Sequence, residues 1–170
     1  MPKVYHDELF SFSIEDQQLT TFIKMKVHPT FAYTDNFPQT YEVLKQYFPS
    51  VLLAKCFNRK RLPFAQEVKD TELGHLFEHL ILENLYRIRL SQSVASPVYK
   101  GVTEWDWNRE PRGTFNITLH AGFRDAEILP RAINKSVELL KKVISPISVA
   151  DATHETPTDS HIGLPVDIVL

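Results

Sequence analysis

Two histidines and a glutamate lie within five consecutive residues of a stretch that is otherwise rich in leucine. They are His75, Glu78 and His79, in the run TELGHLFEHLILE at residues 71–83. At about 100° per residue of an α-helix, His75, His79 and Glu83 fall within about 80° of one another, and Glu78 lies about 60° to the other side of His75. The four side chains therefore share one stripe of a helix, and apolar side chains take roughly the opposite half.

Two imidazoles one helical turn apart can direct nitrogen atoms at one point, which is the geometry that Zn²⁺ or another divalent metal requires of a helix. A carboxylate one residue before the second histidine can activate a water molecule without occupying the coordination sphere. This arrangement is the inverted zincin motif H-x-x-E-H. We interpret His75 and His79 as candidate metal ligands and Glu78 as the candidate catalytic base.

A zinc hydrolase needs a third protein ligand and leaves a fourth position for water. Glu83 could serve from the same helix. His120 could serve from a neighbouring element, because it lies near the end of the alternating run TFNITLHA at 114–121 and faces away from the apolar side of that strand. Cys56 follows the apolar run VLLAK, and we interpret it as a small buried core residue in preference to a ligand or a nucleophile.

A simpler interpretation of the stripe is a solvated face. Its histidines and glutamates would then pair at i, i+3 and i, i+4, and each pair would contribute about 0.2–0.5 kcal/mol. Leu82 and Tyr86 lie on the same stripe, however, and a wholly solvated face would not need them. Their presence favours the wall of a pocket. For His120, an ordinary surface histidine is the equally simple interpretation.

Two further groups could contact a substrate. Arg59, Lys60 and Arg61 form a basic turn whose side chains could bind substrate carboxylates. Trp105 and Trp107, two residues apart on a strand, share a face and could form a contact surface for an extended polyamide. A solvated turn and a lid over the sheet edge account for the same residues.

Composition and charge exclude several classes of protein. The chain has 170 residues and a net charge of −2, from 19 basic and 21 acidic residues, so nothing favours general attraction to nucleic acid or to an anionic membrane. No apolar run approaches the ~20 residues that span a bilayer, and the start lacks the order of a secretory signal. Because the single cysteine cannot form an internal disulfide, we expect a cytoplasmic protein.

Periodicity predicts the elements that position these residues. Strands are expected at 20–27, 50–56, 98–105 and 114–121. Helices are expected at 38–48, from 70 or 71 to 90 with Asp70 or Thr71 as the cap, and at 125–144. We therefore expect a single α/β domain of the α+β type at 1–150: a two-layer sandwich in which helices cover one face of a mixed or mostly antiparallel sheet. Residues 151–170 are expected to form a C-terminal tail.

A cysteine, a basic turn and a G-H-x-x-E-H-x-x-L-E helix follow one another from Cys56 to Glu83. Further matching positions are Gly101-Val102-Thr103, Arg112-Gly113-Thr114-Phe115-Asn116-Ile117 and Ala132 in the final helix. Over roughly residues 40–145 this order resembles the N-terminal domain of cyanophycin synthetase.

In some members of that family the domain is similar to pitrilysin-type metallopeptidases and cuts a polymer of aspartate that carries arginine. The resemblance implies a metal role for His75 and His79 and a catalytic role for Glu78. Two departures matter. No nucleotide-binding region follows, so polymer synthesis is not implied. His120 stands where the family typically has a carboxylate, so the third ligand stays open.

Three functions fit these observations. The first is a metal-dependent hydrolase that cleaves amide bonds in a peptide or peptide-like polymer, with Glu78 passing a proton to the leaving amine. The second is a non-catalytic peptide- or polymer-binding module that uses the basic turn and Trp105. The third is a structural subunit whose stripe is buried in a homo-oligomer interface.

Overall fold

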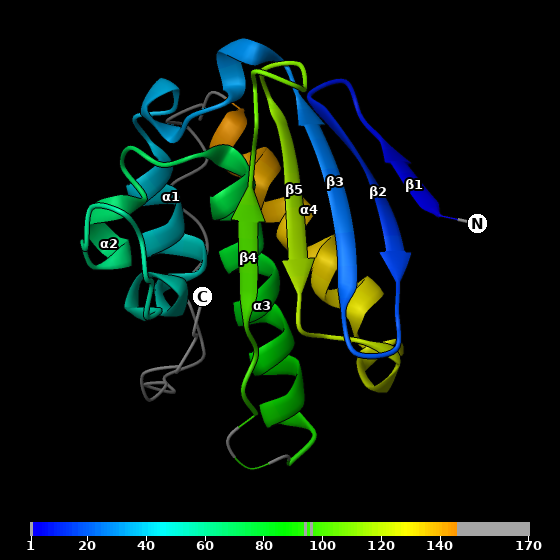
Figure 1. Ribbon diagram of the computed structural model, residues 1–170. Helices are drawn as coiled ribbons and strands as arrows, with labels where there is room; N and C mark the ends of the chain where they lie inside the picture. The colour runs from blue at the N-terminus through cyan, green and yellow to red at the C-terminus, as the bar shows by residue number, and fades with distance from the viewer. Residues whose placement is uncertain (1, 94, 96, 146–170) are drawn as a thin grey trace.

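The computed structural model describes residues 2–145 apart from 94 and 96 (Figure 1). One antiparallel sheet has the strand order β1-β2-β3-β5-β4, and α3 and α4 cover one of its faces (Figure 1). The strands are β1 (Lys3–His6), β2 (Phe10–Asp16), β3 (Thr21–Val27), β4 (Gly101–Glu104) and β5 (Thr114–Leu119). The helices are α1 (Thr40–Tyr47), α2 (Phe64–Glu67), α3 (Leu73–Ser91) and α4 (Leu129–Ile144).

This architecture confirms the predicted α+β class, with a sheet that is antiparallel throughout. Three of the predicted strands and all three predicted helices are present, with shifted ends. The largest shift is in α4, which begins at Leu129 because residues 123–125 form a separate 3-10 turn. Pro130 lies in the first turn of α4, where its missing N–H breaks no helical hydrogen bond. The predicted tail at 151–170 lies outside the described residues.

Two strands at the N-terminus were not among the predicted elements. In β2 the run FSFSIED alternates between Phe10 and Phe12, which are buried, and Ser11 and Ser13, which are partly exposed. This period of two is typical of a strand with one face on the core. The two phenylalanine rings pack toward Phe77 of α3, at centroid distances of 6.4 and 5.5 Å.

The predicted strand at 50–56 is wrong. Residues Pro49–Leu53 form a 3-10 helix that directly follows α1. Pro49 occupies its first position and fixes a helical φ, and Val51 and Leu52 are buried while Leu53 is exposed. A short apolar run bounded by proline is compatible with either a strand or a helical turn. Here the run packs as a helical turn in the layer of helices.

The first part of helix α3 is buried on all sides rather than along one face. Every residue from Leu73 to Leu85 is buried. The predicted apolar half of the helix is therefore in the core, but the polar stripe opposite to it is buried as well. At Gly74 the helix approaches the sheet so closely that a Cβ atom would lie 2.4 Å from Cγ of Phe115. Glycine therefore permits this contact between α3 and β5.

The start of α3 also differs from the prediction. Glu72 is the N-cap residue, and its side chain makes no capping hydrogen bond. Asp70 lies further out, and the hydroxyl of Thr71 contacts a histidine ring of the first helical turn. The predicted cap is wrong because the Thr71 hydroxyl contacts the ring of His75 and not a free amide of the helix.

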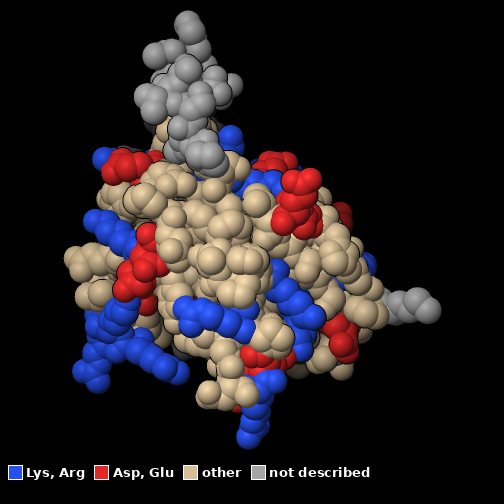
Figure 2. Space-filling view, turned by 90° about the horizontal axis from the view of Figure 1, so that it is seen from above, with Lys and Arg blue, Asp and Glu red and all other residues tan. Residues whose placement is uncertain are grey.

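On the face seen from above, the charged side chains do not gather into a patch of one sign. Figure 2 shows lysine and arginine side chains interspersed with aspartate and glutamate there. Within the described part of the chain, no helix combines the length with the apolar composition of a membrane-spanning segment.

Candidate metal centre

His75 and His79 point at the same place from successive turns of α3. Their Nε2 atoms are 3.2 Å apart, and the ring centroids are separated by 4.8 Å at an interplanar angle of 66°. Both rings are buried, His79 completely and His75 with 8% of its surface exposed. The predicted convergence of the two imidazoles is thus present in the structure.

Cys56 brings a third ligand atom to the pair. Its Sγ lies 3.4 Å from Nε2 of His75, and the thiol and both histidines offer ligand atoms within 4.8 Å of one another. In a tetrahedral zinc site two nitrogen ligands lie about 3.3 Å apart, and a nitrogen and a sulfur ligand about 3.6 Å. The two separations that involve His75 match these values, and the third ligand atom pair, of Cys56 and His79, lies within 4.8 Å, so the three side chains are a candidate set of metal ligands. The interpretation of Cys56 as a core residue missed this contact.

Burial keeps all three groups neutral. It lowers the pKa of His75 to about 4 and lowers that of His79 well below its ordinary value, with the neighbouring His75 adding to the second shift. Burial also raises the pKa of the Cys56 thiol to about 11. A thiolate–imidazolium pair of the kind used by cysteine nucleophiles is therefore disfavoured, whereas neutral imidazoles are the form that binds metal.

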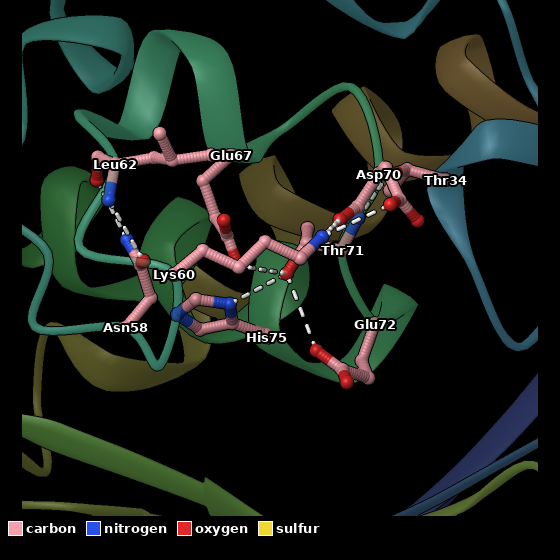
Figure 3. A network of polar contacts seen from close by, with 9 residues as sticks. All are labelled: Thr34, Asn58, Lys60, Leu62, Glu67, Asp70, Thr71, Glu72 and His75. Atoms are coloured by element: carbon pink, nitrogen blue, oxygen red, sulfur yellow. Dashed lines mark hydrogen bonds and ion pairs between the residues drawn. The ribbon is translucent and has the colours of Figure 1, made fainter.

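Polar contacts hold the ring of His75 from behind, whereas Nδ1 of His79 has no partner among the described residues. Oγ1 of Thr71 lies 2.8 Å from Nδ1 of His75, and also 3.5 Å from Oε1 of Glu67 and 3.3 Å from Oε2 of Glu72 (Figure 3). The far nitrogen of His75 is thereby engaged, which leaves Nε2 facing the site. Such contacts fix the tautomer and orientation of a metal-binding histidine.

The loop that carries Cys56 is held by Asn58. Its Nδ2 donates to Sγ of Cys56 at 3.4 Å and to the carbonyl of Leu62 at 2.7 Å, and its Oδ1 accepts from the Leu62 amide at 3.0 Å. The turn includes Arg61 at a positive φ of 54°. Asn58 therefore supports the turn and lowers the pKa of the thiol, against the larger opposing effect of burial.

Glu78 lies beside the centre and not among the ligands. Its Oε2 accepts a 2.5 Å hydrogen bond from Oγ1 of Thr103, and its Oε1 has no partner among the described residues. A Cβ atom at Gly101 would lie 2.8 Å from Oε1, so β4 packs directly on the carboxyl group. Burial raises the pKa of Glu78 to about 8.

A cleft of about 630 Å³ opens onto His75. It is lined by the segment 102–105, which includes most of β4, by residues 57–60, and by Glu67, Asp70 and Glu72. Arg59 and Trp105 face each other across it, with the guanidinium carbon 5.6 Å from the centroid of the ring. Because β4 is an edge strand, its outer side is free of other strands among the described residues.

Of the remaining predicted site residues, Lys60 lines the cleft and the others lie away from the three ligand atoms. His120 is exposed just after β5, on the opposite side of the strand from the buried Ile117 and Leu119, so the structure does not bring it to the histidine pair. Glu83 is buried one turn beyond His79 and is also outside the group of ligand atoms. Lys60 lines the cleft and pairs with an acidic residue, and Arg61 does not line it.

The stripe is covered by this chain itself. The ring of Phe64 stacks on His79 at a centroid distance of 3.9 Å, and β4 covers Glu78. A partner subunit is therefore not needed to bury these side chains, which removes the reason for placing them in an oligomer interface.

No protein-family model, curated protein or solved structure matches this chain. The geometry of the site therefore carries the functional argument.

Proposed function

We propose that this protein is a metal-dependent hydrolase that cleaves amide bonds in a peptide or peptide-like polymer. One observation carries the proposal: Cys56, His75 and His79 offer three ligand atoms within 4.8 Å of one another, and His75 also lines an open cleft. A carboxyl group, that of Glu78, lies on the same helix one residue before the second histidine.

Three protein ligands leave one tetrahedral position for a reactant, which distinguishes a catalytic from a structural zinc site. When bound, a divalent ion would supply Lewis-acid polarisation of an amide carbonyl and of a water molecule. Cys56 must lose its proton to bind the ion, and the hydrogen bond from Asn58 favours the thiolate. His75 and His79 are already neutral.

Glu78 would act as the base. It would accept a proton from water as the oxygen attacks the carbonyl carbon and would deliver that proton to the nitrogen as the C–N bond breaks. The hydrogen bond from Thr103 engages one carboxyl oxygen, and the other, which is buried against β4, has no partner among the described residues and would take the proton. The positive charge of a bound ion would favour the carboxylate form of Glu78, opposing the effect of burial.

The walls of the cleft suit an extended substrate. The free edge of β4 can pair with a peptide backbone by strand addition, which gives affinity independent of side chains. Trp105 and Arg59 offer an apolar surface and a cation on the same stretch of the cleft. These features favour a peptide or polyamide over a compact small molecule.

The second candidate is a peptide-binding module without catalysis. It draws on the same cleft and on the contact between Arg59 and Trp105. It gives no reason for a buried carboxyl group beside three converging ligand atoms, since burying such polar groups without partners costs free energy. The hydrolase therefore accounts for more of the site.

The test uses the zinc-loaded protein and a library of fluorogenic peptides. The wild type should cleave amide bonds, and a chelator should abolish the activity. Glu78→Gln should lower kcat by about 10²-fold or more while zinc content stays unchanged. Glu8→Gln, on an exposed turn, is the matched control and should retain activity. Cleavage by Glu78→Gln at the wild-type rate, or chelator-resistant cleavage, would refute the hydrolase.

A further inference from the structure

One end of the cleft is acidic. Glu67, Asp70 and Glu72 line it together, and we refer to these three residues as the acidic end. It lies directly behind the candidate metal centre, because Thr71 contacts both Glu67 and the ring of His75 (Figure 3). A group bound there would lie close to the place where an amide bond is cleaved.

Glu67 is the innermost of the three carboxyl groups. Only 5% of its surface is exposed, its Oε1 has just the long 3.5 Å contact with Thr71, and its Oε2 has no partner among the described residues. Buried carboxyl groups normally carry several hydrogen bonds, since leaving their oxygens unpaired is costly. The Oε2 atom itself is covered in the ligand-free protein, but Glu67 lines the cleft, so a small movement of its side chain would bring this unpaired oxygen to a ligand that donates hydrogen bonds.

Lys60 shows what kind of group fits the rim of this end. Its Nζ lies 2.8 Å from the backbone oxygen of Asp70 and 2.9 Å from Oδ2 of the same residue. Both side chains are about half exposed, 48% and 63%, so the pair is weak and easily exchanged. One ammonium against three carboxylates leaves the acidic end short of positive charge.

We propose that the acidic end binds a cationic group of the substrate, with Glu67 as the principal acceptor. The group is either the α-ammonium of a peptide or the side chain of a lysine or arginine. This inference rests on the proposed function, because it takes the cleft to be the place where the substrate lies. It gives the hydrolase a preference for amide bonds close to a positive charge.

The test measures binding without cleavage. The zinc-loaded full chain carrying Glu78→Gln is titrated by calorimetry with three kinds of short alanine peptide. The first kind is a set of peptides blocked at both ends, each with one lysine at a different position. The second kind is the same set with norleucine in place of lysine. The third kind is the norleucine set with a free amino terminus. A charged hydrogen bond should make one cationic kind bind about tenfold more tightly than the blocked norleucine peptide.

A second substitution assigns the effect to the acidic end. Glu67→Gln should abolish the preference for the cationic peptide, while Glu104→Gln, in the part of the lining that β4 contributes, should retain it. Glu72→Gln at the rim should reduce the preference and serves as the test if Glu67→Gln fails to fold. A preference for the free amino terminus identifies the α-ammonium, and a preference for lysine identifies the side chain.

Equal affinity for charged and neutral peptides would overturn this inference, and so would a preference that survives Glu67→Gln, or no binding at all. Zinc content and cleavage by the wild-type protein are measured in parallel. They decide the hydrolase proposal separately, because a hydrolase without charge preference would still bind zinc and cleave the norleucine peptide.

Discussion

Oγ1 of Thr71 lies 2.8 Å from Nδ1 of His75, so a residue outside α3 fixes the ring that faces Cys56 and His79. Thr71→Val keeps the shape of the side chain and removes the hydroxyl. We predict a 10- to 100-fold loss of zinc affinity, roughly the effect of removing an outer-shell partner. Competition with a chromogenic chelator measures this affinity.

Thr71→Ser is the matched control, since it retains the hydroxyl, and it should bind zinc nearly as tightly as the wild type. Zinc affinity in Thr71→Val equal to that of Thr71→Ser would show that this contact does not orient His75.

Gly101 gives Glu78 the space that it occupies. A Cβ atom at this position would lie 2.8 Å from Oε1 and 3.0 Å from Cδ of Glu78, so Gly101→Ala must displace the carboxyl group. We predict at least a tenfold lower kcat for peptide cleavage, because small displacements of a catalytic group are costly, with zinc content unchanged. Val98→Ala, at an exposed position before β4 that does not line the cleft, should affect kcat little. Full activity in Gly101→Ala would separate Glu78 from the reaction.

Gly74 controls the distance between α3 and β5. In an exposed helix Gly→Ala stabilises by about 1 kcal/mol. Here the new Cβ would lie 2.4 Å from Cγ of Phe115, so Gly74→Ala should instead destabilise by about 1–3 kcal/mol in urea denaturation. Phe115→Leu provides space and should make the two substitutions less costly together than the sum of their separate effects. Stabilisation by Gly74→Ala would contradict the packing described.

The acidic end predicts a dependence of stability on pH. Burial raises the pKa of Glu67 above its ordinary value of 4.5, and Lys60 opposes that shift. The folded protein therefore holds this proton more firmly than the unfolded chain, so the stabilising contribution is present below pH 4.5 and is lost as pH rises through the raised pKa. Glu67→Gln should remove this loss, so that its stability relative to the wild type increases with pH above 4.5.

Urea denaturation of the zinc-free protein at successive pH values measures the difference. Glu8→Gln, at an exposed position, should follow the wild type at every pH. A constant difference between Glu67→Gln and the wild type would mean that Glu67 does not titrate differently in the folded state.

The fold class could be predicted from the sequence because most elements carry clear periodicity. The alternation in residues 114–119 and the apolar spacing in α4 depend on local sequence alone. The strand predicted at 50–56 was wrong because Val51 and Leu52 are buried within a 3-10 helix. A short apolar segment is equally compatible with a buried strand and a buried helical turn. The alternating run FSFSIED of β2 also has the period of two that is typical of a strand.

The candidate site was predictable where its members lie on one helix. His75, Glu78 and His79 are fixed by the period of α3, so their proximity follows from spacing. Cys56 comes from a loop 19 residues earlier, and no sequence periodicity places a loop against a helix. The spacing also could not exclude His120 as a ligand. Whether the end of β5 that carries His120 lies near the histidines of α3 depends on how the helix packs on the sheet.

Metal content measured on the purified full chain tests the central claim most directly. After loading with zinc and dialysis, elemental analysis should give about one Zn²⁺ per chain for the wild type and for His120→Ala, and much less for His79→Ala and Cys56→Ser. The cobalt-substituted wild type should show a thiolate charge-transfer absorption that Cys56→Ser lacks. A wild type that retains no metal, or a Cys56→Ser variant that matches it in both measurements, would contradict the account.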